Sequence, residues 1–132
     1  MTKKTILVVD DDSISRHLIK GFLRDEENYI VETVTSGQDC LNFIENNDVD
    51  LIISDVEMDD LDGIEMSKIL LSKDKTSNVP IILSSIRDQL DVARKSRDFA
   101  NVKKVTQKPY DRNILLSDIK EFCNPYGYPC DL

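Results

Sequence analysis

The sequence predicts an α/β fold in which helices cover both faces of a parallel β-sheet. Short apolar runs alternate along the chain with segments whose apolar residues recur at helical spacing. Most of these runs are nearly continuous in their apolar character, which is typical of parallel strands buried on both faces. Several of them end in carboxylate or hydroxyl residues. The length of 132 residues suits a single domain with one core.

Five segments are predicted as strands because they are short, apolar or β-branched, and bounded by turn residues. They are 5–9, 29–34, 50–55, 79–83 and 103–106. The third strand is almost wholly apolar and ends at Asp55. Pro80 is tolerated in the fourth because it stands at the beginning of that strand.

Five helices are expected between and after these strands. They are 14–23, 36–46, 63–72, 87–98 and, after Asp111, a segment that holds Leu115, Ile119 and Phe122. The expected N-caps are Ser13, Ser36, Asp62 and Asp111, because their side-chain oxygens can accept hydrogen bonds from the first free N–H groups. Ser36 with Asp39 resembles a capping box.

The apolar faces of these helices differ in strength. The first helix has a regular series, which consists of Ile14, Leu18, Ile19, Phe22 and Leu23. The fourth helix has the weakest apolar face, because Leu90 and Ala93 supply most of its apolar contacts. After the last helix, 124–132 contains two prolines and a glycine and is expected to be a flexible tail.

Right-handed crossovers leave few ways to arrange such a sheet. The favoured arrangement is a flavodoxin-like (βα)5 three-layer sandwich with strand order 2-1-3-4-5, whose ligand site lies between strands 1 and 3. The polar residues agree with this order. Those that follow strands 1, 3, 4 and 5 are Asp10, Asp11, Asp12, Asp55, Ser84, Ser85 and Lys108. One edge of the sheet therefore collects the reactive groups.

Composition excludes several classes of protein. The net charge of −8 and an isoelectric point of about 4.6 argue against direct nucleic-acid binding. No apolar run approaches the ~20 residues of a membrane span, and the start lacks a secretory signal, so a cytoplasmic protein is expected. The single histidine, His17, excludes a multi-histidine metal site. The three cysteines lack metal-ligand spacing, and Cys40 is read as a small buried hydrophobic residue.

The carboxylates at the predicted edge need a cation or a proton. At an effective dielectric constant near 20, two of them about 4 Å apart repel by roughly 4 kcal/mol. Oxygen ligands without histidine or cysteine suit Mg²⁺, with Mn²⁺ as an alternative. The hydroxyl of Ser85 and the ammonium of Lys108 would hold phosphoryl oxygens. These groups together indicate phosphoryl transfer with a carboxylate as acceptor.

The chain resembles the receiver domain of two-component response regulators, the CheY-like superfamily. The motifs that carry the resemblance are Ile6-Leu7-Val8-Val9-Asp10-Asp11-Asp12, Asp55 with Met58 and Asp62-Gly63, Pro80 with Ser85, and Lys108-Pro109. No single motif is specific, but the four in this order and spacing are. The resemblance extends from Thr5 to Cys123, so the domain is taken as 1–123 and the tail as 124–132.

The resemblance implies Mg²⁺-dependent transfer of a phosphoryl group from a phosphohistidine to Asp55. The phosphohistidine would belong to a sensor histidine kinase or a histidine phosphotransfer protein. Asp11, Asp55 and the backbone carbonyl of Glu57 would bind the metal, and Asp10 would act through metal-bound water. Ser85 would hydrogen-bond the phosphoryl group and Lys108 would pair with it.

The resemblance also implies a role in bacterial signalling. The Lys108–Pro109 peptide is usually cis in this family. The protein would be a signalling domain whose enzymatic activity is at most self-catalysed phosphotransfer and autodephosphorylation. Phosphorylation would switch the face formed by helix 4, strand 5 and helix 5. That face would contact a downstream protein or a fused output domain, and it is the expected surface of a homodimer.

Some positions depart from the family pattern. Val105 replaces the usual aromatic residue, Ile86 replaces a small residue, Asp59 replaces proline, and Asn101-Val102 replaces Gly-Ala. Glu57 and Arg87 are expected to form an ion pair across the site that limits the entry of water. With Ile86 and Val105 they are the expected modulating residues.

Two alternatives use related chemistry or the same fold. A pseudo-receiver, which is a constitutive interaction module without phosphorylation, is supported by Val105, Ile86 and Asp59. The retention of all five phosphorylation residues argues against it. A hydrolase of the haloacid dehalogenase type needs a second aspartate two positions after the first, where this chain has Glu57, and it is rejected.

Overall fold

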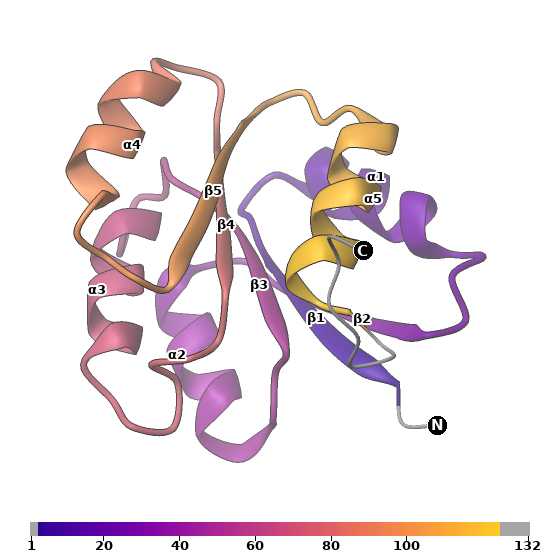
Figure 1. Cartoon of the computed structure of the whole chain (residues 1–132), viewed down its shortest axis with the longest axis horizontal. Coiled ribbons are helices and arrows are strands. Elements are labelled where there is room, and N and C mark those ends of the chain that lie inside the picture. Colours follow the sequence, from indigo (N-terminus) through magenta and orange to yellow (C-terminus); the bar gives the residue numbers. More distant parts are fainter. Residues whose placement is uncertain (1–2, 125–132) are drawn as a thin grey trace.

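The computed structural model describes residues 3–124, which form a parallel sheet between two layers of helices (Figure 1). The strands are β1 (Lys4–Val9), β2 (Tyr29–Val34), β3 (Leu51–Asp55), β4 (Ile81–Ser85) and β5 (Val102–Gln107). The helices are α1 (Ser13–Leu23), α2 (Gly37–Asn46), α3 (Gly63–Leu71), α4 (Gln89–Ser96) and α5 (Arg112–Phe122). The strand order is β2-β1-β3-β4-β5, and every neighbouring pair is parallel. The predicted fold class and strand order are confirmed.

The core lies on both faces of the sheet. Ile6 and Val8 of β1 point to the face covered by α1 and α5, and Leu7 and Val9 point to the face covered by α2, α3 and α4. All four side chains are fully buried. A strand that alternates between two buried faces has to be largely apolar, which is why β1, β3 and β4 are nearly continuous apolar runs, whereas the less buried β2 and β5 also carry polar residues.

The register of the strands brings their carboxyl ends to one level. Val9 pairs with Ser54 across the contact between β1 and β3, so Asp10 and Asp55 follow neighbouring positions. Asp55 in turn pairs with Ser84, and Ser85 pairs with Gln107, the residue before Lys108. The polar residues that follow β1, β3, β4 and β5 are therefore gathered by the pairing of the strands.

Three of the four expected helix caps are confirmed, and one is wrong. Ser36 accepts a hydrogen bond from the backbone N–H of Asp39 at 3.0 Å, and Asp62 and Asp111 cap α3 and α5 in the same way. The cap of α1 is Asp12, not Ser13, and its carboxylate accepts from the N–H of Ile14 at 3.0 Å. Either residue type can cap a helix, so the sequence alone left the choice between neighbours open.

The fourth strand begins two residues later than predicted, at Ile81. The N–H of Val79 is used by a turn, where it donates to the carbonyl of Thr76 at 3.1 Å. Pro80 has no N–H to donate to the sheet. Ile81 is the first residue of this segment whose backbone N–H donates a hydrogen bond toward β5. It donates to the carbonyl of Asn101, the residue before β5, at 2.8 Å.

Some apolar residues of the predicted helix faces are exposed. Ile14 and Leu18 of α1 are 74% and 37% exposed, whereas Ile19 and Leu23 of the same series are buried. Leu90 of α4 is 77% exposed, and Val92, which the pattern did not include, is the buried apolar residue of that helix. The expected apolar contacts of Ile14, Leu18 and Leu90 with the core are therefore wrong.

The remaining predictions concern the cysteines and the tail. Cys40 is fully buried, as expected of a small hydrophobic residue, and burial raises the pKa of its thiol to about 12. Residues 125–132, which include Cys130 and most of the expected tail, lie outside the described residues. Among residues 3–124, none of the helices combines the length and the apolar character needed to span a membrane.

Candidate functional site

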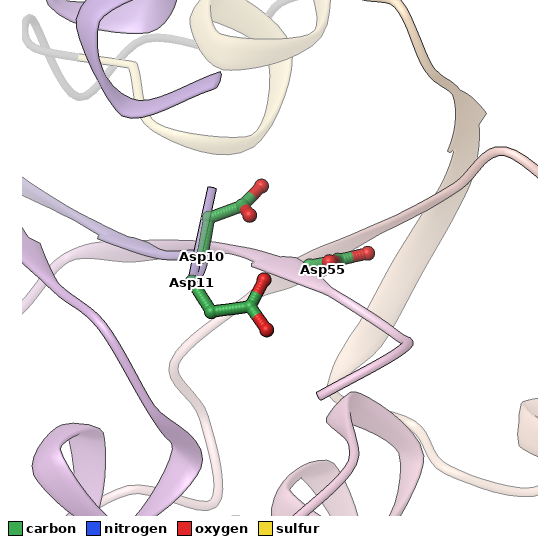
Figure 2. A group of neighbouring side chains, drawn as sticks. All are labelled: Asp10, Asp11 and Asp55. Carbon is green, nitrogen blue, oxygen red and sulfur yellow. The ribbon is translucent and has the colours of Figure 1, made fainter. Parts of the chain in front are cut away.

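Three aspartates converge at the carboxyl edge of the sheet. Asp10 and Asp11 follow β1 and Asp55 ends β3, and Figure 2 shows their carboxylates extending to the same side. One carboxylate oxygen from each lies within 4.8 Å of the others. Asp10 is fully buried, Asp55 is 6% exposed and Asp11 is open to solvent. The cluster therefore combines two buried carboxylates with one that solvent can reach.

Asp10 is held by contacts on both of its carboxylate oxygens. Its Oδ1 accepts from the backbone N–H of Asp12 at 2.9 Å, and its Oδ2 accepts from Nζ of Lys108 at 2.8 Å. Arg16 of α1 donates from its guanidinium to the carbonyl of Asp10 at 2.8 Å. The contacts with Asp12 and Lys108 satisfy a buried charge that would otherwise be strongly unfavourable.

Lys108 is the cation of the site. Its Nζ lies 2.8 Å from Asp10 and 3.5 Å from Asp55, and its backbone N–H donates to the carbonyl of Ser85 at 3.0 Å. The Lys108–Pro109 peptide bond is cis, as the family resemblance implied. Burial alone would lower the pKa of Lys108, but its contact with Asp10 and the charge of Asp55 outweigh burial and raise that pKa. The lysine is therefore charged and shared between the two aspartates.

Asp55 has the strongly shifted carboxyl group of the site. Burial raises its pKa from 3.8 to about 6. The charge of Lys108 opposes this shift, and the charges of Asp10 and Glu57 add to it. In the absence of a metal ion the folded chain thus holds the proton of Asp55 more tightly than an unfolded chain does.

This shift predicts a specific pH dependence of stability. Because the pKa of Asp55 is raised on folding, its contribution to the free energy of unfolding falls as the pH rises between about 4 and 6. In EDTA, we expect Asp55→Asn to become progressively more stable than the wild type over this interval. The gain is about 1–2 kcal/mol, because partial solvation of the site reduces the full electrostatic effect. Urea unfolding of both proteins measures it, and a difference that stays constant with pH would contradict it.

Ser85 contacts Glu57 and the backbone of Arg87. Its hydroxyl donates to Oε1 of Glu57 at 2.6 Å and accepts from the N–H of Arg87 at 2.9 Å. The side chain of Arg87 is exposed, and no ion pair within 4 Å joins it to Glu57 in the part of the chain that is described. The expected ion pair between Glu57 and Arg87 is therefore wrong, because the carboxylate is engaged by the buried hydroxyl instead.

Sequence reasoning missed a buried hydroxyl pair that includes Ser84, the register partner of Asp55 on β4. The hydroxyls of Ser84 and Tyr110 lie 2.6 Å apart, and Ser84 also donates to the carbonyl of Ser54 at 3.2 Å. With that hydrogen used, the hydroxyl of Tyr110 is the donor in the pair. The only signal in the sequence was the position of Tyr110 directly after Lys108-Pro109. The pair joins the end of β4 to the segment that leads into α5.

The other two expected modulating residues are Ile86 and Val105. Ile86 is 70% exposed and directly follows Ser85. Val105 lines a groove between α4 and β5, together with Leu90 and Ala93. The aromatic residue that the family usually has at this position is absent, so no ring can occupy the groove from β5.

The donor set fits a hard divalent cation. All three convergent ligand atoms are carboxylate oxygens, and histidine and cysteine are absent from the cluster. Mg²⁺ and Mn²⁺ are bound by a few carboxylates and keep positions for water and phosphate. Asp10, Asp11 and Asp55 could hold such an ion. Its charge would offset the repulsion between the carboxylates of Asp11 and Asp55, which the charge of Lys108 does not fully cancel.

Comparison with known proteins adds independent findings. A family model described as the response regulator receiver domain matches residues 6–120. The chain is 33% identical over 126 residues to the heme response regulator HssR of Staphylococcus epidermidis, an alignment that covers 95% of this chain and 54% of HssR. The chain thus spans about half the length of this curated relative.

Solved structures share the fold over nearly the whole chain. The signal receiver domain of a signal transduction histidine kinase from Syntrophus aciditrophicus is 25% identical, with a TM-score of 0.83 and coverage of 98% of this chain and 96% of that one. The chemotaxis response regulator CheY4 of Vibrio cholerae is also 25% identical, with a TM-score of 0.81 and coverage of 90% and 98%.

Proposed function

Because this chain belongs to the response regulator receiver domain family, we propose that it accepts a phosphoryl group on Asp55 in a Mg²⁺-dependent reaction. Receiver domains are signalling domains of two-component pathways and not enzymes of the usual kind. The observation that carries the proposal is the environment of Asp55. Its buried carboxylate shares an edge with Asp10 and Asp11 and lies 3.5 Å from Nζ of Lys108.

The proposed donor is the phosphohistidine of a histidine kinase or a histidine phosphotransfer protein. A carboxylate oxygen of Asp55 attacks phosphorus, the P–N bond to the imidazole breaks as the P–O bond forms, and the imidazole nitrogen takes up a proton. The pKa of about 6 leaves the carboxylate of Asp55 ionised at neutral pH, as a nucleophile must be. The product is an acyl phosphate on the end of β3.

The residues around Asp55 have separate roles in this reaction. Lys108 pairs with an oxygen of the transferred group, and Ser85 donates its hydroxyl hydrogen to another. Asp11, Asp55 and the backbone carbonyl of Glu57 are the proposed metal ligands, with Asp10 acting through water. When bound, Mg²⁺ supplies positive charge that offsets the carboxylates and the phosphoryl oxygens.

The signal would pass to a protein partner or a fused output domain through the face formed by α4, β5 and α5. That face is proposed from the family, because receiver domains interact with histidine kinases and output domains. A homodimer built on the same face and a cytoplasmic location are also proposed from the family. Val105 in place of the aromatic residue keeps the pseudo-receiver as the competing proposal. In that case the same face would bind its partner without phosphorylation.

The test is phosphorylation by a small donor. We expect the chain, incubated with acetyl phosphate or phosphoramidate and Mg²⁺, to gain ~80 Da for one phosphoryl group by intact mass. The gain should disappear when EDTA replaces Mg²⁺, because the carboxylates would then repel the donor. A folded chain that shows no gain in saturating Mg²⁺ would favour the pseudo-receiver.

A further inference from the structure

The only hydrogen of the Ser85 hydroxyl is already donated in the resting structure. Ser85 is fully buried, donates its only hydrogen to Glu57 and accepts from the N–H of Arg87. A hydroxyl has one hydrogen to donate and two lone pairs with which to accept. Ser85 therefore cannot hydrogen-bond a phosphoryl oxygen on Asp55 while it keeps the 2.6 Å contact with Glu57.

A phosphoryl group on Asp55 would compete directly with Glu57. Glu57 is two residues after Asp55, and its carboxylate is close enough to be among the charges acting on that aspartate. A phosphoryl group carries between about one and two negative charges at neutral pH and offers three strong acceptor oxygens. It would repel the carboxylate of Glu57 and offer Ser85 a better acceptor.

We propose that Glu57 is a positioning residue that holds Ser85 in a resting orientation, and that phosphorylation of Asp55 releases Ser85 from it. The proposal rests on the proposed function of Asp55. It gives the hydroxyl two alternative acceptors, Glu57 in the resting chain and the phosphoryl group in the phosphorylated one. Glu57 thereby slows phosphorylation, because its hydrogen bond with Ser85 has to break first.

The contacts of Ser85 also give this exchange a route to α4. The N–H of Arg87 donates to the hydroxyl oxygen of Ser85, and the side chain of Gln89 donates to its carbonyl at 2.9 Å. Gln89 is the first residue of α4, and Asp88 is the cap of that helix. A change in the position of Ser85 therefore acts on the beginning of α4 without an aromatic residue at position 105.

A simpler explanation is that Glu57 only repels the phosphoryl donor by its charge. Two conservative variants separate the explanations. Glu57→Asp keeps the charge but is one methylene too short for the contact with Ser85, whereas Glu57→Gln keeps the reach and removes the charge. If Glu57 holds Ser85, Glu57→Asp should be phosphorylated about tenfold faster than the wild type, since a hydrogen bond to a charged acceptor is lost.

The competing explanation predicts the reverse order. If charge alone acts, Glu57→Gln should be the faster variant and Glu57→Asp should match the wild type, which would overturn the proposal. The rates are measured by intact mass with acetyl phosphate at saturating Mg²⁺. Glu65→Asp, the same shortening at an exposed position of α3, is the matched control and should keep the wild-type rate.

Ser85→Ala supplies a double-mutant test. Without the hydroxyl there is nothing for Glu57 to hold, so adding Glu57→Asp to Ser85→Ala should leave its rate unchanged. A tenfold increase that persists in the double mutant would show that Glu57 acts independently of Ser85 and would overturn the proposal.

A readout without any phosphoryl donor keeps this inference separate from the proposed function. In ¹H–¹⁵N NMR spectra of the resting chain, Glu57→Asp should shift the amide resonances of Arg87 and Gln89, and Glu57→Gln should shift them less. Unchanged resonances in Glu57→Asp would overturn the resting contact. If the wild type takes up no phosphoryl group but Glu57→Asp shifts these resonances, the function proposed for Asp55 is rejected and the resting contact stands.

Discussion

Replacing Asp55 with asparagine is expected to abolish the Mg²⁺-dependent gain of a phosphoryl group while the chain stays folded. The amide has nearly the shape of the carboxylate but has no negatively charged oxygen to attack phosphorus. Asp55 lies at the end of β3, 6% exposed, where the strand register fixes it beside Ser84. The expected result by intact mass is no detectable addition under conditions that phosphorylate the wild type.

The neighbouring acids should not take over as acceptors. Asp10 is fully buried, with both carboxylate oxygens in hydrogen bonds to Lys108 and Asp12. Asp11 is exposed and has no lysine within 4 Å among the described residues, so its product would lack the charge compensation that Lys108 gives Asp55. A full gain in Asp55→Asn would mean that the acceptor is another residue, which peptide mapping would identify.

Asp12→Asn is the matched control for this variant. It removes one negative charge beside the site, but its carboxylate faces away, toward the N–H of Ile14 and the hydroxyl of Ser15. Asparagine caps a helix about as well as aspartate, so α1 should keep its stability. Asp12→Asn should therefore accept the phosphoryl group, and a loss in this variant as well would point to net charge and not to Asp55.

The parts of the structure that sequence predicted are those with a repeated local cause. The buried strand that ends at Asp55 and the caps Ser36, Asp62 and Asp111 follow from apolar runs and from side chains that accept hydrogen bonds. The grouping of Asp10 and Asp55 follows from strand order, because parallel strands bring their carboxyl ends to one edge. The predicted strand order thus identified Asp10 and Asp55 as neighbours in space, although no single sequence motif contains both.

The parts that sequence missed depend on choices between adjacent or equivalent partners. Helical spacing could not distinguish the buried Ile19 from the exposed Leu18, because both fall near the apolar face of α1. The partner of Glu57 was also wrong: Arg87 has the complementary charge, but the buried hydroxyl of Ser85 is the group within reach. A side-chain contact of this kind depends on rotamers and distances that residue spacing does not determine.

Gly63→Ala is expected to cause the largest loss of stability among these variants. A Cβ at this position would lie 2.5 Å from the carbonyl oxygen of Asp55 and 3.2 Å from Cα of Val56. Both are backbone atoms, so relief requires movement of the end of β3 or the beginning of α3. We expect the free energy of unfolding to fall by about 3 kcal/mol, as is typical when a packed region must shift to accept extra atoms.

The same substitution at Gly21 should have the opposite effect and separates steric conflict from helix propensity. Gly21 lies within α1, and a Cβ there meets nothing within 4 Å. Alanine is favoured over glycine in a helix by about 1 kcal/mol, so Gly21→Ala should stabilise the chain by roughly that amount.

Urea unfolding measures both variants. A loss of less than about 0.5 kcal/mol in Gly63→Ala, within the usual range for neutral surface changes, would show that the backbone after Asp55 yields easily. The expected larger loss should be accompanied by weaker Mg²⁺ binding in a calorimetric titration, because the carboxylate of Asp55 moves with the same backbone.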